Sequence, residues 1–156
     1  MCSEFSGERT PAVSIRRATE KDMDTIRAMV RGERLDPTQL KVDQFVVAEA
    51  LGSERVVIIG CAQIRRFPGA RELGSLVVNP DWRRRGIGSA LIQYLVEGNS
   101  GSIFLECRAS LAPYYTRFGF RLVARRSLPW ALKVKFGFGV LFSLLPGVSV
   151  AVMKRE

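Results

Sequence analysis

Residues 72–97 read ELGSLVVNPDWRRRGIGSALIQYLVE, and the pattern of this stretch decides the fold class. Its first part is apolar and partly β-branched at Leu73 and residues 76–78, which is typical of a buried strand. The pair Asn79 and Pro80 predicts a turn, because proline cannot donate to a sheet ladder. Farther on, apolar residues recur at the spacing of one helix face, namely Ile87, Ala90, Leu91, Tyr94 and Leu95. The stretch therefore predicts a strand, a turn, a loop and an amphipathic helix.

The loop of residues 83–89, RRRGIGS, is predicted to be the N-terminus of that helix. The first N–H groups of a helix have no partner within it, and Gly86 and Gly88 leave the backbone uncovered. The helix dipole and the three arginines favour negative charge at this end, so we expect a phosphate group to bind here. The spacing excludes a Gly-x-x-x-x-Gly-Lys-Ser/Thr P-loop and lacks the complete Gly-x-Gly-x-x-Gly dinucleotide fingerprint.

Composition narrows the class of protein. The 156 residues predict one domain, residues 1–156, of ordinary globular composition, with 47% hydrophobic and 25% charged residues. The net charge of +9 favours nucleic acid, an anionic membrane or a polyanionic small molecule as partner. The absence of histidine excludes Ser-His-Asp and Cys-His catalysis and any zinc site that needs imidazole. Cys2, Cys61 and Cys107 are too scattered for a disulfide framework or metal knuckle, so we expect free thiols, no metal and a cytoplasmic protein.

The segments around the central stretch complete the domain. Residues 1–11 are polar, lack the apolar core of a secretory signal and are predicted to be loose. The other predicted elements are a strand at 13–16, a helix from Thr19 to Gly32, a short second helix within 33–43, a hairpin of strands 45–50 and 56–65, a strand at 103–107, a helix capped by Ser110 and ended by Gly119, and a strand at 120–124. This order predicts an α/β architecture with helices on both faces of one mixed sheet.

The C-terminal segment 128–147 is unusually apolar, and residues 136–152 form a run of 17 without a charge. A transmembrane helix needs about 20 apolar residues, and Pro146 and Gly147 interrupt this run. We therefore predict an apolar helix or loop near 132–145 and a last strand at 148–153, both buried. A membrane contact of the apolar tail and a protein–protein patch, such as one in a homodimer, stay open as alternatives.

Two motifs resemble the signatures of the GNAT superfamily of acyl-CoA-dependent N-acetyltransferases. The first is Arg83-x-x-Gly86-x-Gly88 in its strand–turn–helix context, and the second is a tyrosine, Tyr115, shortly before the Gly119-Phe120 pair. In order and spacing the resemblance covers about residues 45–124. It implies a mixed, mostly antiparallel sheet of six to seven strands, with helices on both faces and strands four and five splayed at a β-bulge.

The resemblance also implies a cosubstrate and a reaction. Acetyl-CoA would place its pantetheine arm along the main chain of strand four, like an added strand, and its pyrophosphate on the glycine-containing loop. An acetyl group would then pass to a primary amine of a small molecule or protein by direct attack in a ternary complex. The implied cofactor-binding residues are Leu76, Val77, Val78, Arg83, Arg84, Arg85, Gly86, Ile87, Gly88 and Ser89.

By the same resemblance, Tyr115 is the general acid that protonates the departing thiolate, and a core tyrosine is its alternative reading. Glu72, at the start of strand four, is the expected base, with Glu106 as a second possibility and ordered water as the alternative used by many members. Many members also carry an asparagine seven residues before the tyrosine. Arg108 stands there instead, so that CoA contact is not carried over.

The acceptor is not fixed by any motif. The positive charge argues against polycationic acceptors and favours an amine that bears a carboxylate, such as an amino acid or a protein N-terminus. Residues 45–78 also resemble bacterial N-acetyltransferases of the acetylglutamate-forming kind. Two other functions stay open, a non-catalytic acyl-CoA sensor and a basic nucleic-acid-binding module, although the sequence carries no nucleic-acid recognition motif.

Overall fold

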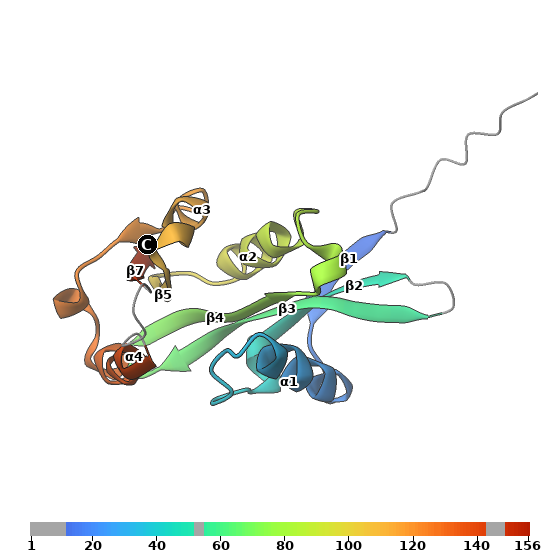
Figure 1. The fold of residues 1–156 in the computed structure, drawn as a ribbon, viewed down its shortest axis with the longest axis horizontal. Helices are drawn as coiled ribbons and strands as arrows, with labels where there is room; N and C mark the ends of the chain where they lie inside the picture. The colour runs from blue at the N-terminus through green and yellow to red at the C-terminus, as the bar shows by residue number, and fades with distance from the viewer. Residues whose placement is uncertain (1–11, 52–54, 143–148) are drawn as a thin grey trace, which may run out of the picture.

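The computed structural model describes residues 12–51, 55–142 and 149–156. Within these ranges seven strands form one sheet in the order β1-β2-β3-β4-β5-β7-β6 (Figure 1). The strands are β1 (Val13–Arg17), β2 (Phe45–Leu51), β3 (Val56–Phe67), β4 (Ala70–Val78), β5 (Ile103–Arg108), β6 (Arg121–Leu122) and β7 (Val150–Arg155). Neighbouring strands run antiparallel except β4 and β5, which are parallel. The predicted mixed, mostly antiparallel sheet is confirmed.

Helices cover both faces of this sheet, as predicted. The α-helices of the described ranges are α1 (Met23–Gly32), α2 (Ile87–Glu97), α3 (Ala112–Thr116) and α4 (Trp130–Phe142). Helices α1 and α4 lie below the sheet in Figure 1, and α2 and α3 lie above it. None of the helices in these ranges combines the length and the apolar character that crossing a membrane requires.

The buried face of α2 differs in part from the predicted one. Ile87, Leu91 and Leu95 are buried as expected, but Ala90 and Tyr94 are exposed. The helix is rotated so that the neighbouring positions, Ile92 and Val96, complete the face that packs on the sheet. The spacing of apolar residues predicts that a helix has an apolar face. Which positions at the border of that face are buried depends on how the helix packs on the sheet.

Strand β4 contains the feature that shapes the site. Its register with β3 moves from Cys61 opposite Val77 to Gln63 opposite Gly74, so β4 carries one extra residue between these pairs. Ser75, inside this bulge, has a positive φ of 49°. Pairing of β4 with β5 is recorded only between Glu72 and Phe104, within the described residues. The two strands splay beyond that point, as predicted, and the second half of β4 keeps its ladder with β3 but has no ladder partner on the side of β5.

Several predicted local features are different in the structure. The region 33–43 holds no α-helix: Thr38 closes an Asx-type turn on Asp36, and only the 3₁₀ turn η2 (Val42–Gln44) follows. Ser110 lies inside the 3₁₀ turn η4 (Ala109–Leu111) and does not cap α3, whose N-cap is Leu111. The predicted strand at 120–124 is shortened to β6, because Phe120 turns into the core and Val123 bonds β7 only through its amide.

The predicted helix near 132–145 corresponds to α4, and the predicted last strand at 148–153 corresponds to β7. Leu132 and Phe136 of α4 pack with Phe104 and Val152 in a core cluster below the sheet. The expectations for residues 1–11, for part of the hairpin loop and for residues 143–147 lie outside the described residues.

Candidate active site

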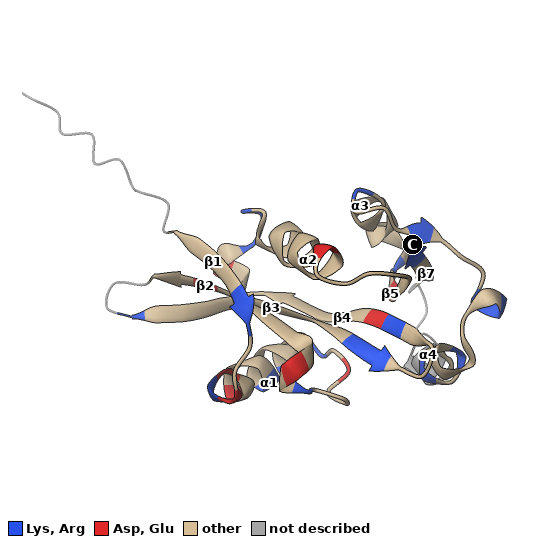
Figure 2. Ribbon diagram, turned by 180° about the vertical axis from the view of Figure 1, so that it is seen from behind, with Lys and Arg blue, Asp and Glu red and all other residues tan. Residues whose placement is uncertain are grey.

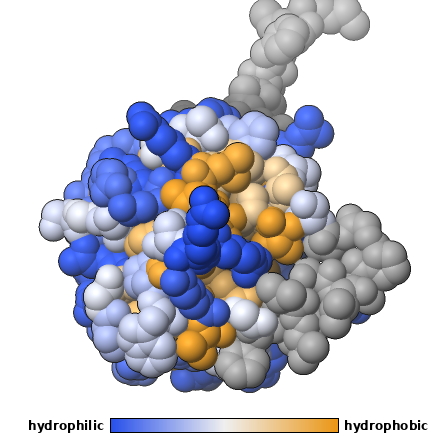
Figure 3. Space-filling model, turned by 90° about the vertical axis from the view of Figure 1, so that its left-hand side faces the viewer, coloured by the Kyte–Doolittle hydropathy of each residue, from blue (hydrophilic) through white to orange (hydrophobic). Residues whose placement is uncertain are grey.

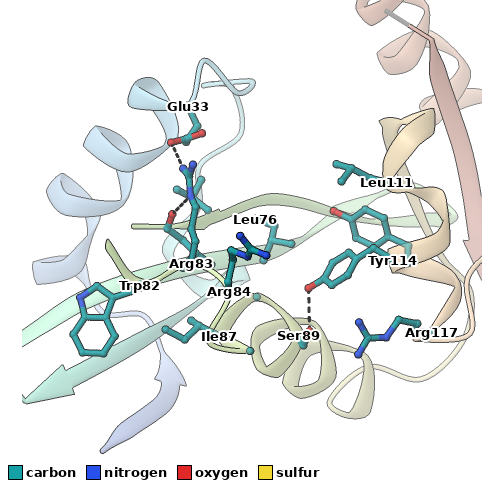
Figure 4. Close-up of a pocket in the computed structure, with 15 residues that line it drawn as sticks. Glu33, Leu76, Trp82, Arg83, Arg84, Ile87, Ser89, Leu111, Tyr114 and Arg117 are labelled. Atoms are coloured by element: carbon teal, nitrogen blue, oxygen red, sulfur yellow. Dashed lines mark hydrogen bonds and ion pairs between the residues drawn. The ribbon is translucent and has the colours of Figure 1, made fainter. Parts of the chain in front are cut away.

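A cavity of about 680 Å³ opens where β4 and β5 splay apart, between the N-terminus of α2 and helix α3 (Figure 4). Nine of the ten predicted cofactor-binding residues line it, and so does Tyr115; Arg85 does not. The sequence alone did not single out the remaining lining residues, which are Glu33, Trp82, Leu111, Tyr114 and Arg117. The structure thus brings residues from four separate segments to one hollow.

The N-terminus of α2 forms one wall of this cavity. Gly86 is the N-cap, with a left-handed φ of 79° and no side chain to bond the first amides of the helix. Gly88 lies so close to the opposite wall that a Cβ there would be 3.2 Å from the Tyr114 hydroxyl. Ile87 between them is buried and fixes the turn to the core. The main-chain N–H groups of this turn therefore remain free to bind an anion.

The three consecutive arginines do three different things. Arg83 donates through Nε to the Val78 carbonyl at 3.0 Å and pairs with Glu33 at 2.5 Å, so it ties the loop after β4 to the end of α1. Arg84 lines the cavity with a positive φ of 62°. The guanidinium of Arg85 lies 5.2 Å from the centre of the Trp82 ring, and Arg85 is not part of the cavity lining. Among them, Arg84 is the one placed to add positive charge beside an anion.

Helix α3 supplies two tyrosines with different surroundings. Tyr115 packs edge to face on Tyr114 and on Phe120, with ring centroids 5.3 and 6.1 Å apart. Burial raises the pKa of the Tyr115 hydroxyl above its ordinary value, so this group stays protonated at neutral pH. The Tyr114 hydroxyl instead lies 3.2 Å from Ser89 Oγ across the cavity, and Arg117 lies over the Tyr114 ring (Figure 4).

Arg117 and Tyr114 could have been suspected from spacing. They are three residues apart, so they share a face of α3 with Leu111. All three line the cavity, which makes that face the wall opposite α2. The sequence motif directed attention only to Tyr115.

Glu72, the expected base, is not among the residues that line the cavity. It lies under the sheet beside α4, is only 4% exposed and is held by cations. The Nζ of Lys135 is 2.6 Å from each Glu72 carboxylate oxygen, and Arg65 is 3.3 Å away. Asp36 completes a network of two cations and two anions. The guanidinium of Arg65 fits there because residue 74 is glycine; a Cβ would lie 2.5 Å from it.

Glu106, the second candidate base, also lies outside the cavity lining. It accepts a hydrogen bond from Arg125 at 2.8 Å, and burial raises the pKa of its carboxyl. Of the predicted acid and bases, therefore, only Tyr115 lines the cavity that the loop before α2 borders.

Comparison with known proteins agrees with this geometry. A family model described as an acetyltransferase (GNAT) domain matches residues 41–122. Among solved structures, N-acetylglutamate synthase from Neisseria gonorrhoeae, complexed with coenzyme A and N-acetyl-glutamate, has a TM-score of 0.74 at 19% identity. That alignment covers 94% of this chain and 35% of the synthase, so this chain spans about a third of that protein.

Two further structures are similar over most of their own length. Rv2747 from Mycobacterium tuberculosis, in complex with CoA, has a TM-score of 0.71 at 18% identity, with 91% of this chain and 98% of that chain covered. NAA60 from Arabidopsis thaliana, in complex with a bisubstrate analogue, has a TM-score of 0.56 at 22% identity, with 72% and 86% covered. At such identities the likeness concerns the fold.

Proposed function

This chain belongs to the GNAT family of acetyltransferases, and on that premise we propose that it transfers an acetyl group from acetyl-CoA to a primary amine. The observation that carries this proposal is the cavity at the splayed strands, which gathers Tyr115, the amides before α2 and the open edge of β4. The 156 residues would act as a single catalytic domain.

The residues present fit a coenzyme A thioester. A diphosphate would accept hydrogen bonds from the main chain of residues 86–89, and Arg84 and Arg117 would add positive charge from two walls. The pantetheine amides would pair with main-chain groups of residues 76–78, which β5 leaves free. Gly88 supports this fit, because any side chain there would narrow the passage beside Tyr114.

The chain then supplies three contributions to acetyl transfer. An N–H of β4 near Val77 or Val78 would stabilise the oxyanion formed when the amine attacks the thioester carbonyl. As the carbon–sulfur bond breaks, Tyr115 would donate its proton, or a strong hydrogen bond, to the departing thiolate. The attacking nitrogen loses one proton to solvent, and the sulfur gains one from Tyr115. Tyr115 then regains a proton from water, so the protons balance.

The proton on the attacking nitrogen needs an acceptor, and we assign this role to ordered water. Glu72 is engaged by Lys135 and Arg65 under the sheet, which supports a structural role for its carboxylate. Water as acceptor was the alternative to Glu72 that the family resemblance left open. A base-catalysed step through water would operate once the amine is largely neutral, at pH values near its own pKa.

For the acceptor we propose an amine with a nearby carboxylate, such as an amino acid or a protein N-terminus. The charge of +9 disfavours polycationic acceptors. The solved N-acetylglutamate synthase complex holds N-acetyl-glutamate, which is an acetylated amino acid on the same fold. The buried free thiol of Cys61 is in keeping with a reducing compartment such as the cytoplasm.

The test is release of free CoA, followed with a thiol reagent, in the presence of acetyl-CoA and a panel of amino acids, peptides and polyamines. We expect release with α-amino acids or peptides and little with polyamines. Thermal stabilisation by acetyl-CoA without release for any amine would favour the acyl-CoA sensor. No stabilisation at all would contradict both, since a ligand at 100 times its Kd should add about 2.7 kcal/mol.

A further inference from the structure

The positive charge of this chain is concentrated in its last third. Residues 107–156 contain nine lysines and arginines and a single acidic residue, Glu156. Eight of the nine net positive charges therefore belong to this segment, and residues 1–106 are almost neutral. In the ribbon of Figure 2, blue segments mark α3, β7 and the chain before α4 at one end of the molecule, whereas red segments gather around α1. Such an asymmetry points to an anionic partner at that end.

Helix α4 lies at this basic end and is apolar on two sides. Leu132 and Phe136 face inward and are buried in the cluster below the sheet. Trp130 and Val134, four residues apart and so on one face, are 70% and 49% exposed. A helix that only packs on a sheet needs one apolar stripe, so the second one calls for a further partner.

Positive charge lies beside the exposed apolar face of α4. Its charged residues, Lys133 and Lys135, are both positive. Lys135 is drawn inward to Glu72, whereas Lys133 is exposed beside Trp130 and Val134. Arg126, also exposed, comes four residues before the helix. Seen from this end, apolar and strongly hydrophilic side chains lie next to one another on the surface (Figure 3).

We propose that the outer face of α4, formed by Trp130, Lys133 and Val134, docks on the surface of an anionic lipid bilayer. Tryptophan prefers the boundary between headgroups and acyl chains, valine enters the apolar side, and lysine and arginine attract anionic headgroups. A nucleic acid would instead favour stacking aromatics along a basic groove, and this face offers one aromatic ring beside an aliphatic side chain.

The docking is peripheral and depends on charge. Each lysine or arginine near an anionic surface increases partitioning about fivefold, and salt screens this term over a Debye length. We therefore expect the full chain to bind vesicles that contain about 30% phosphatidylglycerol in phosphatidylcholine, to bind pure phosphatidylcholine much more weakly, and to dissociate at ~0.5 M salt.

The experiment is vesicle co-sedimentation of the full chain, with tryptophan fluorescence in a Trp82→Phe background, which leaves Trp130 as the reporter. The double variant Trp130→Ser/Val134→Ser should reduce partitioning at least about tenfold, and its matched control is Leu51→Ser, an apolar residue 64% exposed on the hairpin. The emission of Trp130 should move to shorter wavelength on anionic vesicles.

A second pair of variants tests the charge. Arg126→Glu/Lys133→Glu should lower partitioning about 25-fold or more, whereas Arg31→Glu on α1, also exposed, should lower it much less. All of these side chains are exposed, so we expect each variant to keep the fold. Circular dichroism checks this.

Two results would overturn the proposal. One is the absence of binding to anionic vesicles at low salt. The other is vesicle binding that stays unchanged when Trp130, Val134 and Lys133 are replaced. Retention on duplex DNA or on an acidic protein, combined with no retention on vesicles, would assign the basic end to that partner and would equally reject the lipid surface.

Discussion

Replacing Glu72 by glutamine is expected to lower the free energy of unfolding by about 3–5 kcal/mol. The carboxylate is 4% exposed and lies 2.6 Å from Lys135 and 3.3 Å from Arg65. An amide of the same shape leaves the buried Arg65 and the partly buried Lys135 with only Asp36, which is more exposed, to balance them. Since a domain is stable by about 5–15 kcal/mol, this loss should lower Tm by about 10 °C or more.

Urea unfolding measures this loss, and a double-mutant cycle isolates its origin. Lys135→Met should also destabilise, and the double variant should show a coupling of about 1–3 kcal/mol with Glu72→Gln. The control is Glu20→Gln, an exposed carboxylate, with an expected change within about 0.5 kcal/mol.

The same variant separates a structural role of Glu72 from a catalytic one. If the carboxylate holds α4 and β3 together, turnover per folded Glu72→Gln molecule should stay within about twofold of the parent, measured well below its Tm. A variant of unchanged stability whose turnover falls about 100-fold, with the loss of the acidic limb of the pH profile, would show that Glu72 is the base and that our reasoning is wrong.

Three further predictions concern single residues. Tyr115→Phe should lower turnover about 100-fold and leave the Kd for acetyl-CoA within about twofold; unchanged turnover would remove Tyr115 from the mechanism. Burial raises the pKa of the Cys61 thiol to about 12, so iodoacetamide at about pH 8 should label it only after unfolding, as read by peptide mass spectrometry, and labelling of the native protein would contradict its burial. The Arg16 guanidinium holds the pKa of Asp22 well below its ordinary value, so the stability that this carboxylate contributes is present above about pH 4 and lost as the pH falls further. Asp22→Asn should therefore lower the free energy of unfolding by about 1.5–3 kcal/mol at neutral pH, slightly less near pH 3 and much less near pH 2, and a loss that stays constant from pH 7 to pH 2 would refute the assignment.

The strand, turn and helix of residues 72–97 could be predicted because their signals are local. Alternation of apolar residues, a proline that ends the strand and glycines before the helix act within a few positions of one another. All nine predicted cofactor-binding residues that line the cavity come from this continuous stretch. A phosphate-binding loop at a helix N-terminus is built from main-chain groups, which sequence spacing specifies well.

The surroundings of Glu72 could not be predicted in this way. The bulge at Ser75 breaks the alternation of β4, so counting positions no longer tells which face of the sheet a residue occupies. Lys135, the partner of Glu72, is 63 residues away in sequence, on a helix whose packing depends on the whole sheet. The pairing of Arg83 with Glu33 spans 50 residues and is equally invisible to local patterns.

The two tyrosines of α3 show the same limit on a smaller scale. A motif selects Tyr115, but only the folded arrangement of α2 and α3 brings Tyr114 across the cavity to Ser89. That contact joins the walls formed by α2 and α3 at the place where a coenzyme would pass. Positions that meet across a cavity, in general, follow from the fold and not from sequence spacing.

Calorimetric titration of acetyl-CoA into two glycine variants tests the central claim most directly, namely that the amides before α2 hold the diphosphate. Gly86→Glu and Gly69→Glu introduce the same side chain at positive φ, 79° and 69°, with no neighbouring atom in contact range at either position. Only Gly86 borders the cavity. We predict that Gly69→Glu binds acetyl-CoA like the parent and that Gly86→Glu weakens binding at least about 100-fold. Equal affinities in the two variants would contradict the account.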